Sequence, residues 1–126
     1  MHASPPVFLA IVSALSVLLA SPSYGHAQAL DGGRLFRQRC ASCHAIEAGR
    51  NVVGPHLFAV IGRKAGSVDG ARYSEAMRGA ETVWDVQALD RFLASPRQFM
   101  PGTTMSMAVP NAGERKALID YLDALR

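Results

Sequence analysis

The chain has 126 residues, a formal net charge of +3 and two cysteines. Its small positive excess and the lack of any basic stretch interleaved with aromatic residues argue against nucleic-acid binding. The length suits a single domain with a small core, and the sequence contains no internal repeat.

The N-terminal stretch has the features of an export signal. An apolar run extends from Val7 to Ala20, and Ala27-Gln28-Ala29 has the small-x-small form of a signal-peptidase site. We therefore expect residues 1–29 to be a signal peptide cleaved before Leu30, residues 30–126 to form one domain, and the protein to be periplasmic. The stretch before Val7 has no Lys or Arg. The alternative is a leader that is retained as a membrane anchor, although the run is shorter than the roughly 20 apolar residues of a span.

The first expected helix begins after Asp31, a good N-cap, and runs through Leu35 and Phe36 to Cys40. It leads into Cys40-Ala41-Ser42-Cys43-His44, the attachment signature of a c-type haem. One helical turn brings both thiols to the same side, where each can form a thioether with one haem vinyl group. The His44 imidazole then lies beneath the iron as a ligand.

Two other uses of a Cys-x-x-Cys pair are a redox dithiol and half of a zinc site. A dithiol does not need the adjoining His44, and the chain has no second Cys pair to complete a zinc tetrad. The sequence therefore favours a single covalent haem c, bound through Cys40 and Cys43.

The rest of the chain predicts helices separated by long loops. Residues 45–67 contain four glycines and Pro55, which predicts loops with at most a helical turn at residues 57–61. We expect a short helix at residues 74–77 and a longer one that is capped by Asp85 and ends at Pro96, with one apolar face made of Val86, Leu89, Phe92 and Leu93.

The C-terminal region divides into an irregular segment and a helix. Residues 96–110 have no periodicity and contain three prolines and three methionines. Asn111 as N-cap and Glu114 three residues later resemble a capping box, and the helix that follows has an apolar face of Leu118, Ile119, Leu122 and Leu125. No segment alternates as a strand does, so the predicted fold class is all-α.

These residues together resemble class I cytochrome c of the mitochondrial and related bacterial type, over essentially all of residues 30–126. The resemblance is carried by Gly32, Phe36, the Cys-x-x-Cys-His motif, Gly54-Pro55, Gly62-Arg63-Lys64, Tyr73-Ser74, Trp84, Pro96, Pro101-Gly102-Thr103-x-Met105, Glu114-Arg115 and Leu118-Ile119-x-Tyr121-Leu122. It implies a small fold in which the N- and C-terminal helices pack across each other and long loops wrap one haem. Gly32 and Phe36 should then meet Leu118 and Tyr121.

The resemblance also implies a set of site residues. Met105 would be the sixth iron ligand, because a thioether is a soft donor and the Pro101-Gly102 bend can turn it toward the haem, whereas Met100 and Met107 would only pack. His56 is a less favoured alternative, since it lies close in sequence to His44. The Pro55 carbonyl would accept the ring N–H of His44. The haem propionates would contact Arg63, Tyr73, Trp84 and Thr103.

The sequence departs from the family pattern at Phe92 and Phe99, where Tyr is common, at Met77, often Asn, and at Thr104, often Lys. The family meets acidic partners through a ring of lysines, whereas here the nearby cations are mainly Arg39 and Arg97. The function implied is that of a monomeric one-electron carrier between redox proteins such as a quinol–cytochrome c reductase and a terminal oxidase. A peroxidase-like haem enzyme, or the cytochrome subunit of a dehydrogenase or oxidase, is the alternative.

Overall fold

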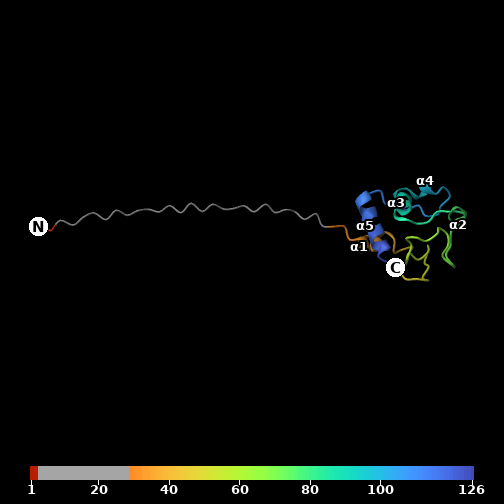
Figure 1. The fold of residues 1–126 in the computed structure, drawn as a ribbon, viewed down its shortest axis with the longest axis horizontal. Coiled ribbons are helices and arrows are strands. Elements are labelled where there is room, and N and C mark those ends of the chain that lie inside the picture. The colour runs from red at the N-terminus through yellow and green to blue at the C-terminus, as the bar shows by residue number, and fades with distance from the viewer. Residues whose placement is uncertain (3–28) are drawn as a thin grey trace.

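The computed structural model describes residues 1–2 and 29–126 (Figure 1). The helices of this part are, in chain order, α1 (Gly32–Arg39), α2 (Glu75–Arg78), α3 (Val86–Ala94), α4 (Pro96–Phe99) and α5 (Ala112–Asp123). Its β-structure is limited to two isolated bridges, so the predicted all-α class is confirmed. The predicted signal peptide lies almost wholly outside the described residues and stays a prediction. None of the described helices is long and apolar enough to cross a membrane.

The first and last helices pack directly on each other (Figure 1). A Cβ atom on Gly32 would lie 2.1 Å from the carbonyl oxygen of Ala117 and 2.7 Å from Cβ of Tyr121, so only glycine permits this approach. The Phe36 and Tyr121 rings lie 5.8 Å apart between centroids. The expected crossing is therefore present, with Ala117 in direct contact with Gly32.

Each of the three longer helices begins at the cap expected from the sequence. Asp31 accepts a hydrogen bond from Arg34 N, Asp85 from Ala88 N and Asn111 from Glu114 N, at 3.1, 2.7 and 3.0 Å. Helix α1 ends at Arg39, one residue earlier than expected, with Cys40 as its C-cap. The Glu114 carboxylate lies 2.8 Å from Arg39 and thereby links the start of α5 to the end of α1.

Two details of the segment around α3 and α4 were predicted wrongly. Val86, the first residue of α3, is 42% exposed because it lies at the edge of the packed core, and Ala88 joins Leu89, Phe92 and Leu93 on the buried face. Residues 96–99, expected to be irregular, form α4 with Pro96 in its first turn. Four residues are too few to show a helical period, so the pattern could not reveal this helix.

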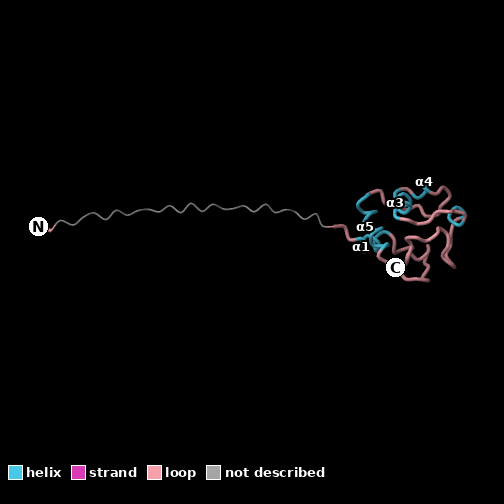
Figure 2. Tube along the Cα trace, viewed as in Figure 1, coloured by secondary structure: helices cyan, strands magenta, loops and turns pink. Residues whose placement is uncertain are grey.

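Outside the three longer helices α1, α3 and α5, the described chain consists of loops and turns and of the short helices α2 and α4 (Figure 2). Residues 57–62 contain turns but no helix, in line with the expected upper limit of one turn. Backbone hydrogen bonds attach the loops to one another, to α3 and to the residues that follow α5. Leu57 N donates to Ala45 O, Ala59 N donates to Leu125 O and Val109 N donates to Leu93 O. These contacts hold the loops around one interior space.

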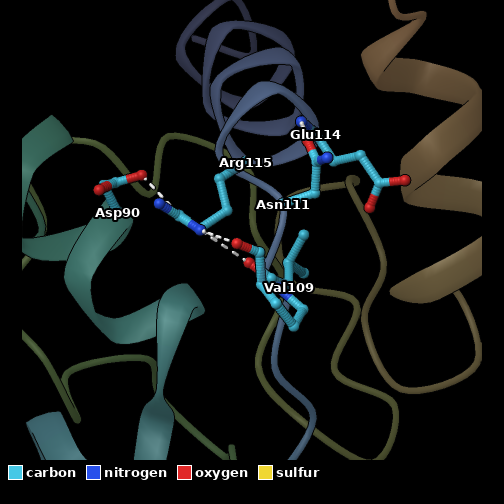
Figure 3. Close-up of polar contacts among 6 residues, drawn as sticks. Asp90, Val109, Asn111, Glu114 and Arg115 are labelled. Carbon is cyan, nitrogen blue, oxygen red and sulfur yellow. Dashed lines mark hydrogen bonds and ion pairs between the residues drawn. The ribbon is translucent and has the colours of Figure 1, made fainter.

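Arg115 on α5 fastens the loop that carries Met105 (Figure 3). Its Nε donates to Asp90 Oδ1 on α3 at 2.7 Å, and its Nη1 donates to the carbonyls of Val109 and Pro110 at 3.0 and 2.7 Å. The Arg115 side chain is only 13% exposed, so water competes weakly for these bonds. One side chain thus ties α3, α5 and the end of the Met105 loop together.

We predict that Arg115→Ala lowers the free energy of unfolding by about 2–4 kcal/mol, because it leaves partly buried acceptors without their charged donor. Denaturant unfolding of the holoprotein measures this loss. The matched control is Lys116→Ala on the same helix, because the Lys116 side chain is 77% exposed and pairs with Asp120 one turn away. The control should change the stability by about 0.5 kcal/mol or less. Equal losses in the two variants would contradict the assigned role of Arg115.

Candidate functional site

A cavity of about 500 Å³ lies at the centre of the fold. All nine site residues predicted from the sequence lie on its wall: Cys40, Cys43, His44, Pro55, Arg63, Tyr73, Trp84, Thr103 and Met105. Much of the remaining wall is apolar and includes Leu57, Val60, Leu89, Phe92, Leu93, Leu118 and Leu122. The structure therefore brings together residues that are far apart in sequence, from the Cys40 motif to Leu122.

The two cysteines are presented by a tight turn that follows α1. The N–H groups of Cys43 and His44 both donate to the carbonyl of Cys40, at 3.0 and 2.9 Å. Burial raises the pKa of the Cys40 thiol to about 11, although the nearby Arg39 opposes this shift. A redox dithiol needs a thiol that ionises easily. The local environment of Cys40 therefore disfavours the dithiol alternative.

The His44 ring is held by the backbone of the next loop. Its Nδ1 lies 2.7 Å from the Pro55 carbonyl oxygen, which can only accept, so Nδ1 carries the proton and Nε2 is free to bind a metal. Burial lowers the pKa of His44, the Pro55 bond opposes this shift, and Arg63 contributes to the lowering. The imidazole is thus kept neutral, which is the form that binds iron.

Gly54 packs flat against the same ring. A Cβ atom at this position would lie 2.5 Å from Cε1 and 2.9 Å from Nδ1 of His44. Gly54 N also donates to the carbonyl of Cys43 at 2.8 Å, which fixes the loop on the motif. The Gly54-Pro55 pair therefore sets both the position of the imidazole and its hydrogen bond.

The wall also carries three polar side chains, Arg63, Tyr73 and Thr103. The Arg63 guanidinium donates to the carbonyls of His56 and Phe58 at 2.8 and 3.1 Å, and burial lowers its pKa. Tyr73 accepts a hydrogen bond from Val68 N through its hydroxyl, at 3.1 Å. Buried Thr103 accepts one from Met105 N at 3.3 Å. These groups could receive anionic substituents of a large apolar ligand.

The three methionines of the 96–110 segment are in different environments. Met105 is half-buried on the cavity wall, whereas Met100 is buried in the core and does not line the cavity. Met107 also lines the cavity and is 38% exposed. The sequence predicted only a packing role for Met107 and did not place it on the cavity wall. The wall also holds Met77, one of the departures from the family pattern.

Two further residues complete the comparison with the sequence predictions, one that was disfavoured as a ligand and one that was not assigned a role. His56, the alternative ligand, is not among the residues that line the cavity, and its Nδ1 is buried with no hydrogen-bond partner within the described part of the chain. Asn51, which carried no sequence signal, contacts two loops through its side chain. Its partners lie 5 and 18 residues away, so no local motif could identify them.

Comparisons with known proteins agree with this geometry. The family model described as Cytochrome c matches residues 29–126. The chain belongs to the cytochrome c family. The chain is 43% identical to cytochrome c-type cyt cy of Rhodobacter capsulatus over 95 residues, which are 75% of this chain and 47% of that protein, so it spans about half of that relative. It is 41% identical to cytochrome c2 iso-2 of Magnetospirillum molischianum over 88 residues, 69% of this chain and 91% of that protein.

A solved structure shares the fold. Cytochrome cH from Methylobacterium extorquens superposes with a TM-score of 0.67 and is 34% identical, covering 74% of this chain and 94% of that chain. Members of the cytochrome c family are electron carriers that hold haem c covalently through a Cys pair, here Cys40 and Cys43. The cavity fits such a group, because it joins two thiols and an imidazole to a largely apolar wall that also carries Arg63, Tyr73 and Thr103.

We predict that Gly54→Ala destabilises the holoprotein by about 1–3 kcal/mol, because the new methyl group overlaps the His44 ring and must displace it. The displacement should also weaken the bond to Pro55, which the chemical shift of the His44 Nδ1 proton reports. Gly79→Ala is the matched control, since its Cβ would meet only Glu75 O at 3.4 Å and its φ is negative. An unchanged Nδ1 proton in Gly54→Ala would contradict the assigned contact.

Proposed function

We propose that the protein is a periplasmic one-electron carrier in which His44 and Met105 are the two axial ligands of the haem iron. Haem c supplies the redox couple, with iron alternating between the ferric and ferrous states. The chain holds the ligands in place and excludes water. The proposed partners are a donor such as a quinol–cytochrome c reductase and an acceptor such as a terminal oxidase, with the carrier acting as a monomer.

The observation that carries the proposal is the convergence of His44, the two thiols and Met105 on one apolar cavity. With Nδ1 of His44 bonded to Pro55, its Nε2 is the nitrogen available to iron. The Met105 loop is fixed at its start by Thr103 and at its end by Arg115. Ligands fixed in this way change little between oxidation states, which favours fast electron transfer. Periplasmic location rests on the expected leader, and Arg63, Tyr73, Trp84 and Thr103 are proposed to hold the propionates.

The alternative function is that of a peroxidase-like enzyme with a labile sixth ligand. Met107 gives this alternative a structural basis, because a second thioether lies on the same wall as Met105 and is more exposed to solvent. Carbon monoxide binding to the reduced holoprotein separates the two functions. Slow, weak binding supports the carrier, and rapid binding supports the enzyme.

We predict that Met105→Ala abolishes the sulfur-to-iron charge-transfer absorption of the ferric protein and lowers its reduction potential, because a neutral thioether favours ferrous iron. Met100→Ala should keep the absorption and lose only packing energy, about 2 kcal/mol or more, since Met100 is buried in the core. Met107→Ala should keep it with little loss of stability. If the absorption disappears in Met107→Ala but persists in Met105→Ala, the ligand is Met107.

The cavity wall also determines how charged reagents approach. Arg72 is an exposed residue of the wall, whereas Arg97, expected there from the sequence, is not part of it. Arg39 is on the wall but pairs with Glu114 at 2.8 Å, which compensates its charge. Steering of acidic partners by this face should therefore be weak and should depend mainly on Arg72.

We predict that Arg72→Gln slows reduction of the ferric protein by anionic ferrocyanide about twofold at low ionic strength, as expected for the loss of one exposed charge. The difference from wild type should disappear at high salt. Arg34→Gln is the control, because it removes the same charge from an exposed residue outside the cavity wall. An equal effect of both variants would show that net charge, and not this face, steers the reagent.

A further inference from the structure

The hydrogen bond of His44 is one link in a longer chain of polar contacts. Its acceptor, the Pro55 carbonyl, belongs to the peptide unit that joins Pro55 to His56. The N–H at the other end of that same unit donates to Asn51 Oδ1 at 3.1 Å. One peptide group is therefore hydrogen-bonded at both ends, to the proposed iron ligand on one side and to a side-chain amide on the other.

The orientation of the Asn51 amide is determined by its partners. Its Oδ1 meets the His56 N–H, which can only donate, and its Nδ2 donates to the Asp69 carbonyl at 2.9 Å, which can only accept. A flipped amide would place donor against donor and acceptor against acceptor. The backbone of Asn51 is also placed close to the ring, because it forms an isolated bridge with His44.

An acceptor bound to an amide N–H polarises the carbonyl of the same peptide unit, and such linked hydrogen bonds strengthen one another by about 10–30% per bond. The bond from His56 to Asn51 therefore makes the Pro55 carbonyl a stronger acceptor. A stronger acceptor at Nδ1 gives the His44 ring more imidazolate character and makes its other nitrogen a better donor. A better donor favours ferric iron and lowers the reduction potential.

We propose that Asn51 is a positioning residue that sets the donor strength of His44, and through it the reduction potential, by way of the Pro55–His56 peptide. This inference rests on the proposed ligation of iron by His44. It differs from a purely structural role, in which Asn51 would only join the loop of residues 51–56 to the loop at Asp69. A purely structural role predicts that Asn51→Ala and Asn51→Asp shift the reduction potential in the same direction. A positioning role predicts that they shift it in opposite directions.

The experiment compares Asn51→Ala with Asn51→Asp in the holoprotein at neutral pH. Both variants lose the donor to Asp69, but Asn51→Ala also loses the acceptor for the His56 N–H, whereas Asn51→Asp replaces it with a stronger, charged one. We expect the potential to rise in Asn51→Ala and to fall in Asn51→Asp. The His44 Nδ1 proton of the ferrous protein should move upfield in the first and downfield in the second.

Val52→Asp controls for the added charge, because it places a carboxylate on the adjacent exposed residue. It should shift the potential through space but leave the Nδ1 proton unchanged. If Asn51→Ala yields too little holoprotein, the Nδ1 shifts of Asn51→Asp and Val52→Asp still decide the question. Shifts of the same sign in both Asn51 variants, no shift in either, or an equal proton shift in Val52→Asp would overturn the inference.

Failure of the proposed ligation would be visible separately. If His44 is not an iron ligand, His44→Gln keeps the low-spin spectrum of the wild type. If His44 is a ligand but Asn51 does not act through the peptide, the wild type has a low-spin spectrum and His44→Gln loses it. In that case the opposite shifts of the reduction potential and of the Nδ1 proton in the two Asn51 variants are absent.

Discussion

The covalent attachment of haem c at Cys40 and Cys43 is the constraint on which the rest of the structure depends. The attachment motif begins at the C-cap of α1, so the position of that helix determines where the cavity must form. Several side chains serve the hydrophobic core and the cavity wall at the same time: Val60, Trp84, Leu89, Phe92, Leu93, Leu118 and Leu122. Stability and cofactor environment are therefore determined by the same residues, and a change in one of them affects both.

The sequence predicted the features that depend on local signals. Asp31, Asp85 and Asn111 were identified as caps because a short polar side chain before an apolar period is a local pattern. The attachment motif was identified for the same reason. The resemblance to class I cytochrome c supplied the remaining wall residues, such as Pro55 and Thr103, which no periodicity marks. Their roles toward the haem remain predictions.

The features that the sequence did not predict depend on contacts between distant segments. Glu114 fits a capping box, yet its carboxylate pairs with Arg39, which lies in another helix. Asn51 reaches Asp69, and Arg115 reaches Asp90, only because the fold places these loops and helices together. The exposure of Val86 likewise depends on where the packed core ends, which helical periodicity alone does not define. Pairings of this kind are set by the three-dimensional arrangement of the segments and leave no local pattern in the sequence.

The close crossing of α1 and α5 has a consequence for the order of assembly. Helix α1 has eight residues, too few to be stable alone in water, and its main helical partner is the last helix of the chain. This contact closes a long loop, which is costly in entropy. Without α5 in place, α1 lacks the partner that stabilises it, and the attachment motif that follows α1 lacks a fixed position. The finished fold leaves both cysteines only partly exposed, so haem attachment is sterically easier before the fold is complete than after it.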